Sequence, residues 1–320
     1  MGIEFWIEAS KRLADNESLM LIVVTDIKGS SPGKPGFKML VDKHGPIAGS
    51  IGGGIMEYNM VSLAQQKLIA GTTKIFKEQV KHSKDAGEKA SGLICAGSQS
   101  QVFVPLSQSD KIMADAILSA MHEGRSCVLS ITSSGLSLDG HTDSISNEKT
   151  MQQSAEPIIY RELIKPPDTV YIFGGGHVSL PLSQVCNLAG FRVMVFDDRL
   201  SLMTMKNNMH AHQKKQIDYT NAAKEILHHE TAFVCIMTVS HESDKMILEQ
   251  MLDLPLCYLG MIGSRNKINK IFTELLAKGF GKDKLNQVDS PMGIPIHAVT
   301  PAEIALSIAA KMVETKNCPR

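Results

Sequence analysis

The sequence of 320 residues has no excess charge of either sign, because 33 lysine and arginine residues balance 33 aspartate and glutamate residues. Proteins that bind nucleic acid or anionic membranes commonly carry a basic excess. The sequence also lacks an apolar run near the roughly 18 residues of a membrane helix, and its N-terminus is typical of an amphipathic helix, not of a signal peptide. We therefore predict no nucleic acid partner, no membrane partner and a cytoplasmic location.

Cysteine is scarce as well. Six cysteines are present, without a CxxC pair or a regular framework: Cys95, Cys127, Cys186, Cys235, Cys257 and Cys318. Zinc sites and disulfide scaffolds need such spacings. The sequence therefore predicts reduced thiols and no metal site.

A glycine turn in the second half of the chain lies between a predicted strand and a predicted helix. The short apolar run at 170–173 indicates a buried strand, and the helix is expected to begin near His177. The turn between them consists of Gly174, Gly175 and Gly176. Glycines let the backbone approach a ligand closely, and a helix N-terminus attracts anions. The turn therefore predicts an anion site.

The strand predicted after this helix, at 192–196, ends in an acidic residue. Asp197 follows the first glycine by about 20 residues, the distance at which a carboxylate accepts hydrogen bonds from ribose hydroxyls in dinucleotide-binding proteins. Ser179 stands where a third glycine of that motif is usual. The pattern predicts a Rossmann-type unit, whereas nucleotide binding stays open because many such turns serve packing alone.

The rest of the second half alternates predicted strands and helices. His241 and Asp244 follow the strand at 231–238, and Arg265 follows the strand at 256–259. Ligands of open α/β sheets bind at the carboxyl ends of the strands. We expect these residues at the ligand-binding edge; the alternative is that they cap helices or carry surface charge.

The first half repeats the sequence of strand, triple glycine and helix on a different scaffold. Strands are predicted at 19–25, 37–41 and 46–51, and a helix follows that ends at Gly71. The second glycine turn consists of Gly52, Gly53 and Gly54. It predicts another anion-binding turn, with a turn that serves packing alone as the alternative.

The length exceeds the size to which one hydrophobic core usually grows, so we predict two domains. Apolar content falls and prolines gather at 142–167, which predicts a linker. The predicted fold class is α/β, with an N-terminal mixed α/β domain over 1–150. A C-terminal Rossmann-like domain with a doubly wound parallel sheet is predicted over 165–320.

Seven motifs follow one another along nearly the whole chain. They are GSSPGKPGFKMLV (29–41), GSIGGGIMEYNM (49–60), FGGGHVSLPL (173–182), FRVMVFDDR (191–199), HESD (241–244), YLGMIGSRNK (258–267) and TPAEIALSIAAKM (300–312). In this order they resemble the XdhC/CoxI family of xanthine dehydrogenase accessory factors. The resemblance implies a chaperone for the molybdenum cofactor, in preference to an enzyme. Such a chaperone binds molybdopterin, assists its sulfuration with a cysteine desulfurase, and delivers it to a molybdenum hydroxylase of the xanthine dehydrogenase type. The resemblance also implies a homodimer.

The resemblance places a molybdopterin site in the first domain. The phosphate would bind at the glycine turn 52–54, with Lys34 or Lys38 as the countercharge. Ile55 stands where many members of the family have a cysteine, which leaves Cys95 as the candidate for the molybdenum end. The alternatives are that both lysines are solvated and that Cys95 is a small buried side chain.

Two other functions fit parts of the sequence. An NAD(P)-dependent oxidoreductase would use the turn at 174–176 together with Asp197. A molybdenum-cofactor nucleotidyltransferase would use a glycine loop and a lysine, but the first domain shows no obvious carboxylate pair for Mg²⁺. His177 either faces a ligand at the turn or faces solvent.

Overall fold

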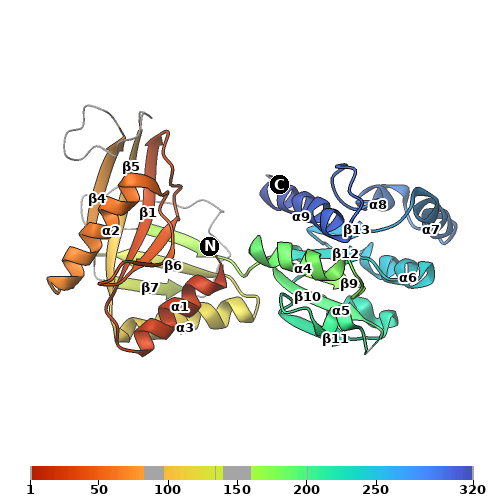
Figure 1. Cartoon of the computed structure of the whole chain (residues 1–320), viewed down its shortest axis with the longest axis horizontal. Coiled ribbons are helices and arrows are strands. Elements are labelled where there is room, and N and C mark those ends of the chain that lie inside the picture. Colours follow the sequence, from red (N-terminus) through yellow and green to blue (C-terminus); the bar gives the residue numbers. More distant parts are fainter. Residues whose placement is uncertain (1, 83–96, 134, 140–159, 200, 319–320) are drawn as a thin grey trace. The chain divides into compact units, whose positions relative to one another are not determined.

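The computed structural model describes residues 2–82, 97–133, 135–139, 160–199 and 201–318. The chain divides into two compact units, Met1–Pro166 and Pro167–Arg320 (Figure 1). Each unit has hydrophobic clusters of its own. None of the helices in these ranges is both long and apolar enough to cross a membrane. Cys95 lies outside the described residues.

The first unit contains a five-stranded antiparallel sheet in the order β3-β2-β1-β5-β4. Its strands are β1 (Leu19–Gly29), β2 (Lys38–Val41), β3 (Pro46–Gly49), β4 (Phe76–His82) and β5 (Gly97–Leu106). Successive side chains of a strand point to opposite faces. Met20 and Ile22 of β1 therefore share one face, where they belong to the same buried cluster as Met56 of helix α2 (Gly54–Ile69).

A second layer covers the other face of this sheet. It consists of α1 (Ile3–Ala14), α3 (Lys111–His122) and a three-stranded antiparallel sheet in the order β7-β6-β8. The strands of that sheet are β6 (Cys127–Thr132), β7 (Gly135–Asp139) and β8 (Tyr160–Ile164). Leu21 of β1, Trp6 of α1 and Leu129 of β6 lie in one cluster. Because β1 is covered on both faces, it reads as a continuous apolar run.

Strand β8 lies inside the range that the sequence predicts as a linker. Tyr160 is completely buried, Ile164 is 8% exposed, and the strand pairs with β6. Every second residue of the strand, YRELI, faces the core, but the central one of these is the charged Glu162, which interrupts the apolar alternation expected of a strand.

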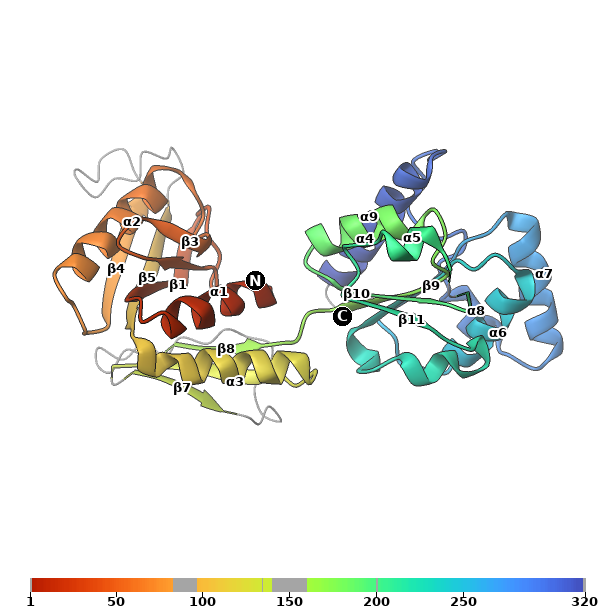
Figure 2. The same ribbon diagram turned by 60° about the horizontal axis from the view of Figure 1, so that its bottom comes forward.

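The second unit contains five parallel strands in the order β11-β10-β9-β12-β13, which are labelled in Figure 1. Figure 2 shows β9, β10 and β11 of this sheet from another side. They are β9 (Thr169–Phe173), β10 (Arg192–Asp197), β11 (Gln213–Gln216), β12 (Ala232–Ile236) and β13 (Tyr258–Met261). The chain first adds strands on one side of β9 and then on the other. This order is the Rossmann order, with its switch point between β9 and β12. The predicted fold class is confirmed.

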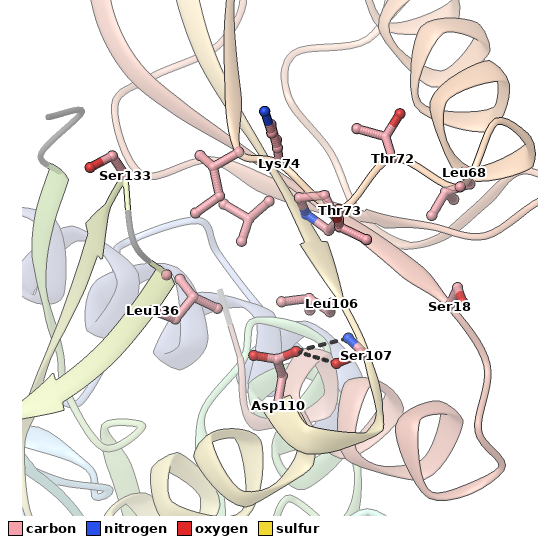
Figure 3. A pocket seen from close by; sticks show the side chains of 15 residues that line it. Ser18, Leu68, Thr72, Thr73, Lys74, Leu106, Ser107, Asp110, Ser133 and Leu136 are labelled. Atoms are coloured by element: carbon pink, nitrogen blue, oxygen red, sulfur yellow. Dashed lines mark hydrogen bonds between the residues drawn. The ribbon is translucent and has the colours of Figure 1, made fainter. Parts of the chain in front are cut away.

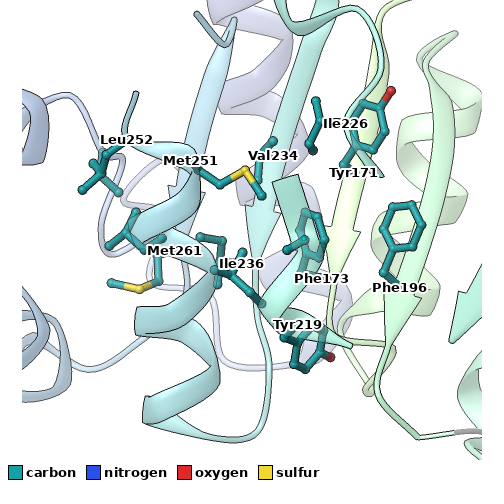
Figure 4. Packing of buried hydrophobic residues seen from close by; sticks show 14 of the residues in the cluster. Tyr171, Phe173, Phe196, Tyr219, Ile226, Val234, Ile236, Met251, Leu252 and Met261 are labelled. Atoms are coloured by element: carbon teal, nitrogen blue, oxygen red, sulfur yellow. The ribbon is translucent and has the colours of Figure 1, made fainter. Parts of the chain in front are cut away.

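Helices cover both faces of the parallel sheet. Helices α4 (Ser179–Leu188) and α9 (Pro301–Asn317) pack on the face that contains Ile172. On the other face, Phe173, Phe196 and Ile236 belong to one buried cluster with residues of α6 (His241–Met251) and α7 (Arg265–Ala277). Figure 4 shows these three side chains together with Met251 of α6. The short helices α5 (Met203–Lys206) and α8 (Lys282–Asn286) lie in the connections. Helix α4 begins two residues later than predicted, after a turn in which the N–H of Ser179 donates to the carbonyl of Gly176.

Candidate functional site

The glycine turn of the second unit follows β9 at the switch point of the sheet. Gly174 has φ = +116°, and a Cβ at this residue would lie 2.3 Å from the carbonyl oxygen of Met237. At Gly175 a Cβ would lie 2.3 Å from Cγ of Met205. At Gly176 it would meet no atom within 4 Å. The backbone of Met237 therefore requires glycine at 174, a side chain at 175 would have to displace Met205, and only the third glycine borders open space.

Helix α5 lies against this turn. The hydroxyl of Thr204 donates a hydrogen bond to the carbonyl of Gly175, and the side chain of Met205 packs on the same residue. Thr204 and Met205 thus cover the backbone at Gly175, which a dinucleotide would have to approach.

Asp197 ends β10 beside this turn, and its side chain is completely buried. Oδ2 accepts hydrogen bonds from the N–H of Gly175 at 2.7 Å and from Nη2 of Arg199 at 2.9 Å. Oδ1 accepts from the N–H and Nε of Arg199 at 3.0 and 2.8 Å. Burial acts to raise the pKa of Asp197, but hydrogen bonds from Arg199 and Gly175 outweigh it and hold that pKa below its usual value. This geometry corrects the expectation of a free carboxylate for ribose, because both oxygens are bound within the protein.

A second buried carboxylate lies at the same edge of the sheet. Oδ1 of Asp244 accepts hydrogen bonds from the N–H of Thr238 at 2.9 Å and from its hydroxyl at 2.6 Å. Oδ2 forms an ion pair with Nζ of Lys267. Asp244 is completely buried, and it joins the loop after β12 to the first turn of α7.

The other predicted residues of this edge are more exposed. His177 borders Gly176 and faces solvent, and Arg265 is the exposed first residue of α7. His241 is the first residue of α6, with Nε2 3.9 Å from Oε1 of Glu274. The structure thus brings the predicted second-unit residues to the carboxyl edge of one sheet, while the ion pairs within the protein neutralise its two buried acids.

The glycine turn of the first unit holds a carboxylate from the helix that follows it. Oε2 of Glu57 accepts hydrogen bonds from the N–H of Ile51 at 2.8 Å, the N–H of Gly53 at 2.9 Å and the hydroxyl of Ser50 at 2.7 Å. Burial acts to raise the pKa of Glu57, but these hydrogen bonds outweigh it and lower that pKa. The turn therefore binds an oxyanion, and in this structure the oxyanion belongs to the chain.

Backbone conformation explains the three glycines of this turn. Gly52, Gly53 and Gly54 have φ values of +129°, +77° and +70°, a region that other residues avoid. A Cβ at Gly52 would lie 2.6 Å from the backbone nitrogen of Gly33, whereas at Gly53 and Gly54 it would meet nothing within 4 Å. The turn packs on the preceding loop through Gly52 and is open at the other two residues.

The two lysines expected to supply countercharge lie in different environments. Lys34 is exposed. Lys38 is buried, with Nζ 2.6 Å from Oε1 of Glu162 and donating to the carbonyl of Gly36 at 3.1 Å. The hydroxyl of Tyr160 donates to the other oxygen of Glu162 at 2.9 Å. This corrects the expectation that Lys38 is free to bind phosphate, because its charge balances a buried carboxylate of β8.

A cavity of about 600 Å³ lies elsewhere in the first unit (Figure 3). Its wall includes Leu106, Leu136 and Lys74, together with Asp110, whose carboxylate accepts hydrogen bonds from the N–H and hydroxyl of Ser107 at 2.8 and 3.0 Å. Of the described residues, those that the sequence predicts for a site do not line this cavity.

Glu57, Arg199 and Lys267 were not predicted from the sequence. Arg199 directly follows Asp197 and Asp198. Lys267 stands three residues after Ser264, the residue that caps the N-terminus of α7. Glu57 is an acid in the first turn of a predicted helix, a common position that gives no separate signal. Only the structure shows that each binds a predicted residue or its turn.

Two family models match the chain. A model described as the XdhC Rossmann domain matches residues 170–312, and one described as the XdhC and CoxI family matches residues 12–78. The chain is 25% identical over 311 residues to the uncharacterized protein YqeB of Escherichia coli (strain K12), a match that covers 97% of this chain and 46% of that protein. The chain thus spans about half the length of this relative.

Other relatives match from end to end. The chain is 24% identical over 326 residues to a Bacillus subtilis (strain 168) protein named as a probable xanthine dehydrogenase subunit, with 95% of both chains covered. It is also similar to a crystal structure of a xanthine dehydrogenase from Bacillus halodurans, with a TM-score of 0.76 and 23% identity over 97% of this chain and 95% of the other. That likeness shows a shared fold. With one family model matched in each unit, the chain belongs to the XdhC and CoxI family.

Proposed function

We propose that this protein is an accessory factor that binds the molybdenum cofactor as cargo for a molybdenum hydroxylase of the xanthine dehydrogenase type. Membership of the XdhC and CoxI family supports this role, as does the name of the Bacillus subtilis relative. One observation carries the location of the site. Three donors of the turn around Gly53 converge on one carboxylate oxygen, so the turn is built to bind an oxyanion.

The phosphate of molybdopterin is the part of the cargo that this turn fits. A phosphate oxygen can accept the same N–H and O–H groups as the Glu57 carboxylate. Gly53 and Gly54 leave open space on the outer side of the turn. The exposed Lys34 of the preceding loop is the available countercharge, since Lys38 is bound to Glu162.

The apolar surface beside the turn suits the remainder of the cargo. Ile55 is 60% exposed and Tyr58 is 72% exposed, and both belong to the first residues of α2. An exposed aromatic ring offers a stacking partner for a planar heterocycle such as a pterin. Sulfuration with a cysteine desulfurase, a role for Cys95 at the molybdenum end and assembly into a homodimer complete the proposal.

The test is to purify the protein from a host that makes molybdopterin and to identify bound small molecules by mass spectrometry. The natural protein should retain molybdopterin. Gly53→Val should lose it, because the new side chain projects into the open space where the phosphate would arrive. The strain of a left-handed valine adds about 1–2 kcal/mol of destabilisation, so the variant must be shown to remain folded.

Gly176→Val is the matched control, because Gly176 also borders open space beside a helix N-terminus but lies in the second unit. It should retain the cofactor. Loss from Gly176→Val with retention in Gly53→Val would move the site to the second unit. Absence of molybdopterin from the natural protein would contradict the proposed cargo.

A further inference from the structure

Helix α2 exposes a face that carries no charge. Of its 16 residues only Glu57 and Lys67 are charged. Glu57 accepts the hydrogen bonds of the glycine turn, and Nζ of Lys67 lies 5.6 Å from the ring centroid of Phe76. A helix that borders solvent usually carries its charges on the exposed face, whereas the core of a protein interface is depleted of charge. The exposed residues of α2 are all neutral, namely Gly54, Ile55, Tyr58, Asn59, Gln66 and Ile69.

The outer residues of α2 are arranged symmetrically about Ser62. Ile55 and Ile69 lie seven residues before and after Ser62, and Tyr58 and Gln66 lie four residues before and after it. With 3.6 residues per turn, all five fall within about 40° of one line along the helix. The face is therefore similar in both directions along the helix, with an isoleucine at each end and a small side chain in the middle.

Such a face is complementary to a second copy of itself. A twofold axis through Ser62 makes two α2 helices antiparallel, so that Ile55 of each copy meets Ile69 of the other. No charge faces a like charge in this arrangement, whereas a charged partner surface would be buried without counter-ions. The proposed function includes a homodimer. Resting on that part of it, we infer that the homodimer forms by antiparallel packing of α2 on α2 of a second copy.

A cavity beside Ile69 gives the second copy a place to enter. The cavity has a volume of about 560 Å³, and Leu68 and Ile69 of α2 belong to its wall. Ile69 is 75% exposed. Ile55 of the second copy would meet Ile69 at the mouth of this cavity. An apolar side chain that fills a pocket is a common anchor of an interface.

The size of the face predicts a reversible dimer. A helix of 16 residues is about 24 Å long and about 10 Å wide, so one face of it covers a few hundred Å². A standard interface buries roughly 800 Å² per partner. We therefore expect a dissociation constant on the order of 1–10 μM.

The second copy would also border the cargo site of the proposed function. The glycine turn directly precedes Ile55, and Ile69 of the second copy packs on Ile55. Ile69 therefore adds to the apolar surface that Ile55 and Tyr58 offer beside the turn. The dimer itself requires no cargo, so its formation can be measured without it.

The test is sedimentation velocity of the full chain, purified from a host that makes no molybdopterin, from about 1 to 100 μM. Ser62→Arg brings two guanidinium groups together on the axis and should raise the dissociation constant at least about 100-fold. Ile69→Arg should act in the same direction and serves if Ser62→Arg does not fold. Ile112→Arg is the matched control, because Ile112 lies on α3 of the same unit and is 78% exposed. It should dimerise like the natural protein.

Disulfide cross-linking tests the antiparallel register. Cys318 is exposed, so all variants carry Cys318→Ser. Ser62→Cys should link two copies on mild oxidation, because its two thiols meet on the axis. Gln66→Cys should link poorly with itself but should link with Tyr58→Cys when the two variants are mixed. Equal self-linking of Gln66→Cys and Ser62→Cys would overturn the antiparallel pairing.

Three results of sedimentation would overturn the inference. They are a natural protein that stays monomeric at about 100 μM, a dimer that both α2 variants leave intact, and equal dissociation of Ile112→Arg. The proposed cargo has a separate readout, which is molybdopterin bound to the natural protein. A dimer through α2 without molybdopterin keeps this interface and removes the cargo. Molybdopterin bound to a monomer keeps the cargo and removes the interface.

Discussion

Both glycine turns of the chain donate a backbone N–H to a carboxylate of the chain, but the surroundings of the two carboxylates differ. Asp197, beside Gly175, is completely buried and binds the guanidinium of Arg199 through both oxygens. Glu57, beside Gly53, is partly exposed and is held by neutral donors. Removing Asp197 leaves a cation and a buried N–H without an acceptor, whereas removing Glu57 leaves only neutral donors and no unpaired cation.

The difference teaches how to read a glycine turn in front of a helix. The turn itself predicts donors for an anion in both units. The other contacts of the carboxylate bound at the turn then show whether that carboxylate is a fixed part of the fold. A cation beside a buried acid, as at Arg199, indicates a permanent part of the fold.

The largest expected effect is on the free energy of unfolding, and it distinguishes two glycines of the same turn, the packed Gly174 and the open Gly176. Gly174→Ala should lower the free energy of unfolding of the second unit by about 4 kcal/mol, because the new Cβ meets the backbone of Met237 at a positive φ. Gly176→Ala, beside open space, should change it by no more than about 0.5 kcal/mol. Urea unfolding of the full chain followed by circular dichroism measures both. Equal losses would mean that the turn is packed along its whole length.

Lys38 provides the next largest effect, in the first unit. Lys38→Met should destabilise this unit by about 3 kcal/mol, because Glu162 would keep a buried charge without its cation. Lys34→Met is the exposed control and should be near neutral. Fluorescence of Trp6, the only tryptophan and a buried residue of α1, reports unfolding of this unit alone. Adding Glu162→Leu to Lys38→Met should restore most of the lost stability; if it does not, the two side chains act separately.

Asp197 should have a smaller effect than Lys38, since its cation is partly exposed and can be hydrated. Asp197→Ala should destabilise the second unit by about 2 kcal/mol and increase hydrogen exchange in β9 and β10. Asp198→Ala, at an exposed carboxylate, is the control. If the natural protein binds NAD(P) and Asp197→Ala abolishes that binding with unchanged stability, then Asp197 contacts ribose and the comparison of the two turns breaks down.

The smallest effect concerns pH. The pKa of Glu57 is lowered in the folded protein, so its contribution to stability is complete above the pKa of an unfolded glutamate, near 4.5. The contribution disappears as the pH falls through the lower pKa of the folded state. The difference in stability between the natural protein and Glu57→Gln, measured by Trp6 fluorescence, should therefore be constant from pH 8 to about pH 5 and vanish in stronger acid. A difference that grows as the pH falls would have the wrong sign.

Several elements could be predicted from local sequence because their causes are local. Strands β9, β10 and β12 are buried on both faces and therefore appear as continuous apolar runs. Positive φ values at Gly52 and Gly174 require glycine, so both turns were visible in the sequence. The Rossmann-type order followed from these runs and the helices between them.

The features that the sequence did not predict depend on contacts between distant segments. Nothing near Lys38 indicates that Glu162 will lie 2.6 Å from it, and a lysine in a glycine-rich loop is a reasonable phosphate ligand until that partner is seen. The sequence predicts Asp197 at the end of β10, where the structure has it. It does not predict that the side chain of Arg199, two residues later, turns back and binds both carboxylate oxygens of Asp197.

The position of β8 has a consequence for synthesis of the chain. Lys38 leaves the ribosome early, but Glu162 and the buried ring of Tyr160 leave it only after the rest of the first unit has been made. The nascent first unit therefore lacks both a core strand and the partner of a buried cation until β8 emerges. A fragment that ends at residue 150 would lack β8 permanently. The first unit can therefore complete its core only after the chain has been translated through Ile164.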